Sequence, residues 1–238
     1  MTRFFTQRWM ILSRRGVFGL MGILPALLFG AFPAQAEDGA ALVRKNGCVE
    51  CHRFSPDASL AGRRGPDLFF AGDKFQEPWL LQWLQQPQPI RPAGYITDPG
   101  FLLGSPSPKV HSALGPVQAK AVTAYLMGLK LAAPGLEVRK WEPLSKGERF
   151  KFKILFERDY GCIACHQSVN LMNKPRGGVS GPSLIDAGDR LRADWVYLWL
   201  KEPQRFEPKG RMPRFDLEEP VRAALTRYVM WHQRNHLQ

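Results

Sequence analysis

The chain has 238 residues, of which 45% are hydrophobic and 23% are charged, and its formal net charge is +12. These proportions are typical of globular proteins and exclude an intrinsically disordered chain. The basic residues are scattered, without long runs of like charge. We therefore interpret them as solvated faces that can steer an acidic partner, and not as a nucleic-acid-binding surface.

Residues 1–36 have the pattern of an export signal. Four arginines and no acidic residue precede an apolar run at 17–32, and the small residues at 34–36 form a cleavage site. We expect export to the periplasm and a mature chain that begins at Glu37. The alternative is that the segment is retained as a membrane anchor, but an apolar run of about 16 residues is short for a span.

The rest of the chain shows the same order of elements twice. A helix leads into a Cys-x-x-Cys-His motif, and an irregular loop, a helix with two tryptophans, a second loop and a closing helix follow. The closing helices, at 117–130 and 219–233, have apolar residues at helical spacing, and no stretch alternates as a strand does. The sequence predicts an all-α fold with one domain at 37–133, a proline-bounded linker at 134–144 and a second domain at 145–238.

All four cysteines lie in the two motifs, CVECH at 48–52 and CIACH at 162–166. One helical turn lets both thiols reach the two vinyl groups of a porphyrin, and the adjacent histidine then projects to the iron. A zinc site usually needs four converging ligands, and a thioredoxin-like pair is not expected twice with histidine after each pair. The motifs therefore predict two covalently attached haems c. The attachment residues are Cys48, Cys51, Cys162 and Cys165, and the proximal iron ligands are His52 and His166.

The two halves also repeat one another outside these motifs. A Gly-Pro-x-Leu step at 65–68 recurs at 181–184, and the tryptophan pair Trp79 and Trp83 recurs as Trp195 and Trp199, each 116 positions later. The members of each pair are one helical turn apart and share a face. We expect them to pack against the porphyrin, with donation of an indole N–H to a haem propionate as the alternative.

Each half resembles a class I cytochrome c domain, and the whole resembles the two-domain dihaem cytochromes c of bacteria. The resemblance rests on the haem motifs, the Gly-Pro-x-Leu steps and the Met-Pro step at 212–213, and it covers nearly all of the mature chain. It implies a small helical shell around each haem, with Met212 as the sixth iron ligand in the second half. It also implies that the carbonyls of Pro66 and Pro182 orient the proximal histidines, although a plain turn would use the same residues.

The first half departs from this pattern because it has no methionine between Met21 and Met127. The position that matches Met212, counted back from the closing helix, is Lys109, and His111 follows two residues later. Lysine must lose a proton before it can bind iron, so His111 ranks above Lys109; Met127, a water or an open site are the other options. The first half also has 13 more residues in the loop 88–116. We expect this loop to rebuild the distal side and give a bis-histidine or otherwise lower-potential haem.

These features predict a periplasmic carrier that passes single electrons between redox partner proteins. We expect no catalytic residue, no nucleic-acid partner, and membrane contact only through an uncleaved N-terminal segment. The alternatives are a haem-bearing subunit of a larger oxidase or dehydrogenase, or an enzyme that acts on a sulfur oxyanion, a nitrogen oxide or peroxide at the first haem, where Arg91 and Lys109 would suit an anion. His232 and His236 follow the last apolar pattern and are expected to face solvent.

Overall fold

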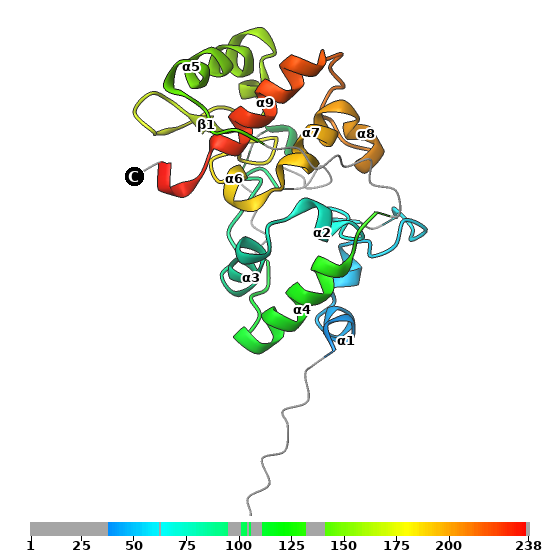
Figure 1. The fold of residues 1–238 in the computed structure, drawn as a ribbon. Helices are drawn as coiled ribbons and strands as arrows, with labels where there is room; N and C mark the ends of the chain where they lie inside the picture. Colours follow the sequence, from blue (N-terminus) through cyan, green and yellow to red (C-terminus); the bar gives the residue numbers. More distant parts are fainter. Residues whose placement is uncertain are drawn as a thin grey trace, which may run out of the picture. The chain divides into compact units, whose positions relative to one another are not determined.

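A computed structural model of the chain describes residues 38–61, 63–94, 101–103, 105, 111–131 and 141–236. Helices dominate both halves (Figure 1), which confirms the all-α class for the described residues. The predicted export signal and most of the predicted linker lie outside these residues. The α-helices are α1 (Gly39–Lys45), α2 (Ala71–Lys74), α3 (Glu77–Gln85), α4 (Pro116–Gly128), α5 (Lys146–Ile154), α6 (Ala187–Arg190), α7 (Ala193–Lys201), α8 (Pro203–Phe206) and α9 (Glu219–Trp231). The shorter turns are η1 (Cys48–Glu50), η2 (Phe101–Leu103), η3 (Leu155–Asp159), η4 (Cys162–Ala164) and η5 (Arg234–His236), of which η3 is a π-helical turn that continues α5.

Local signals account for several helix starts. The side chain of Asp38 accepts a hydrogen bond from the Ala40 amide at the start of α1, at 3.0 Å. Ser145 and Glu148 form a capping box at the start of α5. Proline occupies the first turn of α3, α4 and α9, where its missing N–H removes no helical hydrogen bond.

The same helix packing occurs in both halves. Helices α1 and α3 pack on α4 in the first half, and α5 and α7 pack on α9 in the second. The buried apolar side chains form a core cluster that includes Leu42 and Val122 in the first half and Leu225 and Val229 in the second. Residues 36–238 accordingly form one compact unit, so the boundary between the two repeats does not divide the core.

Equivalent residues of the two halves meet each other directly. Phe75 and Leu191, which are 116 positions apart, form an isolated antiparallel bridge. On either side of it, the amide of Gln76 donates to the Arg190 carbonyl and the amide of Arg192 donates to the Lys74 carbonyl, both at 2.9 Å. In the repeat, Gln76 is equivalent to Arg192 and Lys74 is equivalent to Arg190, so the two bonds are counterparts of each other. The contact therefore has local two-fold symmetry, as in an interface between two copies of one subunit.

The described residues contain one sheet, so the expectation of no strand was wrong at this place. Strand β1 (Ser168–Val169) pairs antiparallel with β2 (Pro175–Arg176), with Ser168 opposite Arg176. Strands of two residues are too short to show the alternation that identifies a strand in sequence. Among the described residues, no helix has the length and apolar character needed to span a bilayer.

Candidate functional site

Each cysteine motif forms a single tight turn. The 3-10 helices η1 and η4 cover the first three residues of the motifs, and each is preceded by a glycine in the left-handed region, Gly47 with φ 68° and Gly161 with φ 59°. The amide of His52 donates to the Cys48 carbonyl at 3.0 Å, and the amide of His166 donates to the Cys162 carbonyl at 3.1 Å. In both halves one turn therefore fixes the histidine relative to the two thiols.

The first cysteine of each motif is held away from its thiolate form. The described residues include all four cysteines, and none of them forms a disulfide. Burial raises the pKa of Cys48 above its ordinary value and raises that of Cys162 to about 11, so neither thiol is activated as a thiolate. The described residues also contain no cluster of three or more His, Cys, Asp or Glu side chains that could hold a metal ion. This arrangement does not fit the tetrahedral zinc alternative.

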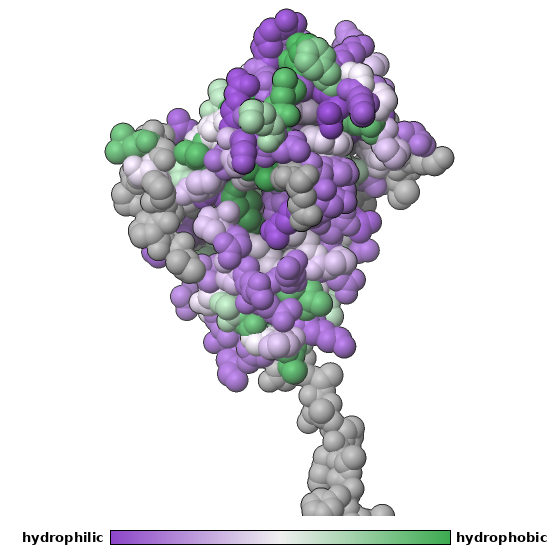
Figure 2. All heavy atoms as spheres, turned by 90° about the vertical axis from the view of Figure 1, so that its left-hand side faces the viewer, coloured by the Kyte–Doolittle hydropathy of each residue, from purple (hydrophilic) through white to green (hydrophobic). Residues whose placement is uncertain are grey.

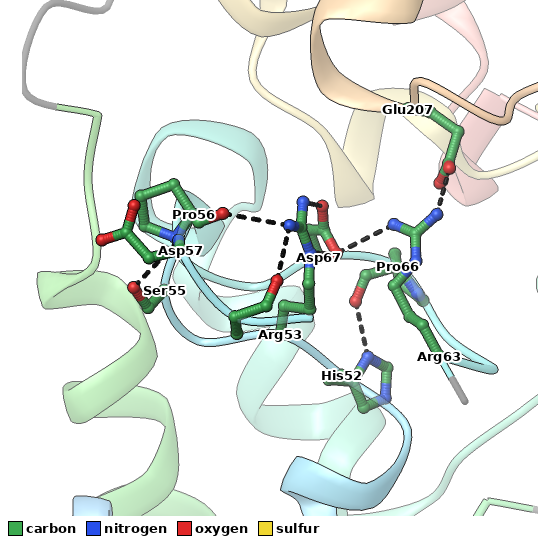
Figure 3. Close-up of polar contacts among 10 residues, drawn as sticks. His52, Arg53, Ser55, Pro56, Asp57, Arg63, Pro66, Asp67 and Glu207 are labelled. Carbon is green, nitrogen blue, oxygen red and sulfur yellow. Dashed lines mark hydrogen bonds and ion pairs between the residues drawn. The ribbon is translucent and has the colours of Figure 1, made fainter. Parts of the chain in front are cut away.

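The two motif histidines are held through the same ring nitrogen. Nδ1 of His52 lies 2.6 Å from the Pro66 carbonyl oxygen (Figure 3), and Nδ1 of His166 lies 2.8 Å from that of Pro182. A carbonyl oxygen can only accept, so Nδ1 carries the proton and Nε2 keeps its lone pair. Burial lowers the pKa of His52 to about 4 and also lowers that of His166. Both rings are therefore neutral near pH 7 and have a free nitrogen for a metal ion.

The glycine before each of these prolines is required by the close approach of the ring. A Cβ atom on Gly65 would lie 2.3 Å from Cε1 of His52, and one on Gly181 would lie 2.7 Å from Cε1 of His166. Both distances are far below van der Waals contact. The repeated glycine thus has a steric reason beyond making a turn.

His111 lies close to the ring of His52. The two ring centroids are 6.3 Å apart, and Nδ1 of His111 lies 2.9 Å from the Ser112 carbonyl oxygen. Two imidazoles that bind one metal through bonds of about 2 Å have centres up to about 6 Å apart, the value reached when they bind from opposite sides. The pair thus has the separation of two ligands on one ion, with Nδ1 of both rings directed at a carbonyl. The alternative Lys109 lies outside the described residues.

The second tryptophan of each pair contacts the predicted distal residue. Trp83 packs on His111 with ring centroids 4.6 Å apart, and Nε1 of Trp199 lies 2.9 Å from Sδ of Met212. Trp83 and Trp199 are equivalent in the repeat. His111 and Met212 thus have the same neighbour in the two halves, although their positions in the sequence do not match.

Buried cationic and donor groups lie where the halves meet. Nε1 of Trp79 is buried and has no hydrogen-bond partner among the described residues. The guanidinium of Arg190 lies 5.9 Å from the centroid of the Trp79 ring, and burial lowers the pKa of Arg190 even though Asp186 pairs with it. Burial and the nearby Arg190 lower the pKa of Lys74 to about 8. An anionic group in this region would satisfy the donor and compensate the cations.

An ion-pair network that the sequence did not reveal supports the first histidine loop. Arg53 and Arg63 both bind the buried carboxylate of Asp67, Arg63 at 2.8 Å, and Arg63 also pairs with Glu207 of the second half (Figure 3). Burial alone would raise the pKa of Asp67, but the hydrogen bonds from the two arginines bring it below its ordinary value. The sequence offers one hint of this network: the residue after Pro66 is the acidic Asp67, whereas the residue after Pro182 is the neutral Ser183.

The expected exposure of the C-terminal histidines holds for His236 and was wrong for His232. His236 is exposed, whereas His232 is fully buried. Nε2 of His232 lies 2.8 Å from Oγ of Ser168, and its Nδ1 lies 2.9 Å from the Tyr228 carbonyl oxygen. Helix α9 ends at Trp231, and the next residue turns inward onto β1. The β1–β2 hairpin, which was not foreseen, thus provides the partner that buries His232.

A comparison with known protein families, curated proteins and solved structures finds no match to the chain.

Proposed function

We propose that the chain is an exported dihaem cytochrome c that transfers single electrons between redox partners in the periplasm. The observation that carries this proposal is the geometry of the two motif histidines. In each half a neutral imidazole donates through Nδ1 to a proline carbonyl, keeps Nε2 free and lies one turn from two thiols. This is the arrangement that covalent haem attachment requires.

The residues present fit a haem in each half. Cys48 and Cys51 would hold the first haem, and Cys162 and Cys165 the second, with His52 and His166 as proximal ligands. When bound, a haem supplies an iron that changes between the ferric and ferrous states. Lys74, Arg190 and the unpartnered Nε1 of Trp79 have the charge and donors to bind propionates.

The chain's own groups would make the two sites different. In the first half, His111 lies at a separation from His52 that suits two nitrogen ligands on one metal. In the second half, Met212 offers a neutral thioether, which favours the reduced state of iron. The first site is therefore expected to have the lower potential, which gives electrons a preferred direction from the first half to the second.

The paired backbone bonds at 74–76 and 190–192 support transfer within the chain. They join the end of α2 to the start of α7 and the end of α6 to the start of α3, through two hydrogen bonds of 2.9 Å, and Phe70 stacks on Trp195 with centroids 4.7 Å apart. A rigid contact keeps the distance between two redox centres constant. The second candidate function, an enzyme that acts on a small anion at the first site, has weaker support, because the 6.3 Å separation of His111 from His52 suits a protein ligand on the metal and not an open position for a substrate.

The test is haem attachment in cells that carry the haem c maturation machinery. We expect two haems per chain by pyridine haemochrome, one after Cys48→Ala with Cys51→Ala, one after Cys162→Ala with Cys165→Ala, and none after all four changes. Cyanide and carbon monoxide should leave the spectrum of the parent protein unchanged. A chain without covalent haem would overturn the proposal, and rapid cyanide binding to the first haem would favour the enzyme.

A further inference from the structure

Three large apolar side chains are exposed together on the second half. Phe150 of α5 is 58% exposed, and Leu171 and Met172 at the tip of the β1–β2 hairpin are 80% and 76% exposed. With Ile154 they line a groove of about 520 Å³ between α5 and the hairpin. Figure 2 looks onto the side on which α5 and β1 lie in Figure 1, and its upper part shows apolar residues among hydrophilic ones. Apolar residues that are exposed as a group mark a binding surface more often than isolated ones do.

The hairpin presents these side chains on an ordered turn. The side chain of Asn170 accepts hydrogen bonds from the amides of Met172 and Lys174, at 2.9 and 3.0 Å, and Asn173 adopts a left-handed conformation with φ 56°. Glu157 of η3 pairs with both Lys153 and Arg176 and so ties the hairpin to the helix. The exposure of Leu171 and Met172 is therefore built into the fold.

The surroundings of the groove are basic. Residues 145–176 contain seven basic and three acidic residues, and each of the three acids is paired: Glu148 with Arg227, Glu157 with Lys153 and Arg176, and Asp159 with Arg158. Lys146, Lys151 and Lys174 are exposed, and no ion pair joins them to an acid among the described residues. The segment that presents the apolar side chains thus also presents three exposed lysines that no acid neutralises among the described residues.

The fold itself does not require this surface, because the first half is built without it. The helix before the first cysteine motif has 7 residues in α1, whereas α5 and η3 together run from Lys146 to Asp159. Between the motif histidine and the Gly-Pro step there are 12 residues in the first half and 14 in the second. The longer helix and the hairpin are thus additions specific to the second half.

We propose that this surface, Phe150, Leu171 and Met172 with Lys146, Lys151 and Lys174, docks the protein on an anionic lipid bilayer. The hairpin tip and Phe150 enter the boundary between headgroups and acyl chains, and the lysines bind lipid phosphates. An acidic protein is the less fitting occupant because protein interfaces are depleted in lysine and enriched in arginine and aromatic residues. Docking of this kind goes beyond the proposed electron transfer and adds a membrane contact that does not depend on the N-terminal segment.

The experiment uses the full haem-bearing protein and vesicles of equimolar phosphatidylglycerol and phosphatidylcholine, with pure phosphatidylcholine vesicles for comparison. We expect cosedimentation with the anionic vesicles that weakens as salt is added. Each of Lys146→Glu, Lys151→Glu and Lys174→Glu should weaken binding about fivefold or more, because a lysine near an anionic surface contributes about a factor of five. Leu171→Ser with Met172→Ser should weaken it at least tenfold.

Matched controls lie in the first half. Val117 is 70% exposed on α4, and Lys120 is an exposed lysine on the same helix, so Val117→Ser and Lys120→Glu should leave vesicle binding unchanged. An environment-sensitive fluorophore on a Met172→Cys variant reports on the tip itself, independently of any N-terminal residues that the protein keeps. Its emission should rise with anionic vesicles only.

Two results would overturn the docking proposal: a fluorophore at position 172 that does not respond to anionic vesicles, or patch variants that bind them as the controls do. Haem content is measured on the same samples. A protein with two haems that ignores vesicles contradicts docking alone, and a chain that binds vesicles without haem contradicts electron transfer alone.

Discussion

The imidazole rings of His52 and His111 lie with their centroids 6.3 Å apart, although 59 positions separate the two residues in the chain. Each ring directs Nδ1 toward a backbone carbonyl oxygen. With Nδ1 engaged, Nε2 is the nitrogen that each ring has left for a metal ion. This relationship makes the first site the most informative place to test the proposed function.

Replacement of His111 should change the first haem alone. In His111→Ala the sixth position is open, so cyanide and carbon monoxide should bind to one of the two haems. In His111→Met the potential of that haem should rise by on the order of 0.1 V, a fraction of the range of about 0.8 V over which axial ligands set haem potentials. Optical redox titration measures both effects. Lys109→Ala is the control, and loss of the low-potential centre in that variant would identify lysine as the ligand.

Trp199 should position Met212 through its indole N–H. A donor on the thioether sulfur draws electron density away from it, so Trp199→Phe should lower the potential of the second haem, with an effect of about 1 kcal/mol on its reduction. The matched variant Trp83→Phe removes the equivalent ring beside His111 and should alter the first haem instead. Identical shifts of both haems in either variant would mean that these tryptophans act only through packing.

The close contacts of Gly65 and Gly181 predict a steric penalty for alanine. A Cβ at 2.3 Å from the His52 ring must displace that ring, so Gly65→Ala should cost about 1–3 kcal/mol of stability and weaken the Nδ1 bond to Pro66. A methyl group on Gly147 in α5 would meet no described atom within 4 Å, so Gly147→Ala should stabilise the helix by up to about 1 kcal/mol. Chemical unfolding of both variants, with the spectrum of the first haem, gives the comparison.

Burial of His232 predicts a loss of stability in acid. Burial lowers its pKa to about 4. The charge of Lys153 lowers the pKa further, whereas the hydrogen bond to the Tyr228 carbonyl and the charge of Glu157 raise it. The unfolded chain takes up a proton near pH 6.5 and the folded chain does not, so stability falls as the pH drops from about 6.5 to about 4. The total loss is on the order of 3 kcal/mol. In His232→Gln the unfolding free energy should depend less on pH over this window, whereas the exposed His236→Gln should keep the parent slope.

The sequence predicted those parts of the fold that depend on local patterns. The helical class follows from apolar spacing, and the second domain was expected to begin at 145, where the capping box of Ser145 and Glu148 starts α5 in the structure. The bonds of the two motif histidines to Pro66 and Pro182, which the resemblance to class I cytochrome c domains implied, are present. Their role toward a haem stays a prediction.

Long-range contacts were beyond this kind of reasoning. His111 was ranked first as the sixth ligand for its chemistry, and no local pattern in the sequence gives its 6.3 Å separation from the His52 ring. The burial of His232 depends on Ser168, which lies in a hairpin whose strands are too short to detect. The pairing of Arg63 with Glu207 joins residues 144 positions apart, and a single sequence has no periodicity that links them.

The bridge between Phe75 and Leu191 has a consequence for how the chain responds to change. A contact in which each residue meets its own counterpart is the kind that two identical subunits make about a two-fold axis, so the chain keeps the geometry of a fused symmetric pair. A substitution at position 75 or 191 acts on both halves at once. Substitutions away from the axis act on one half, so the surroundings of His52 can differ from those of His166.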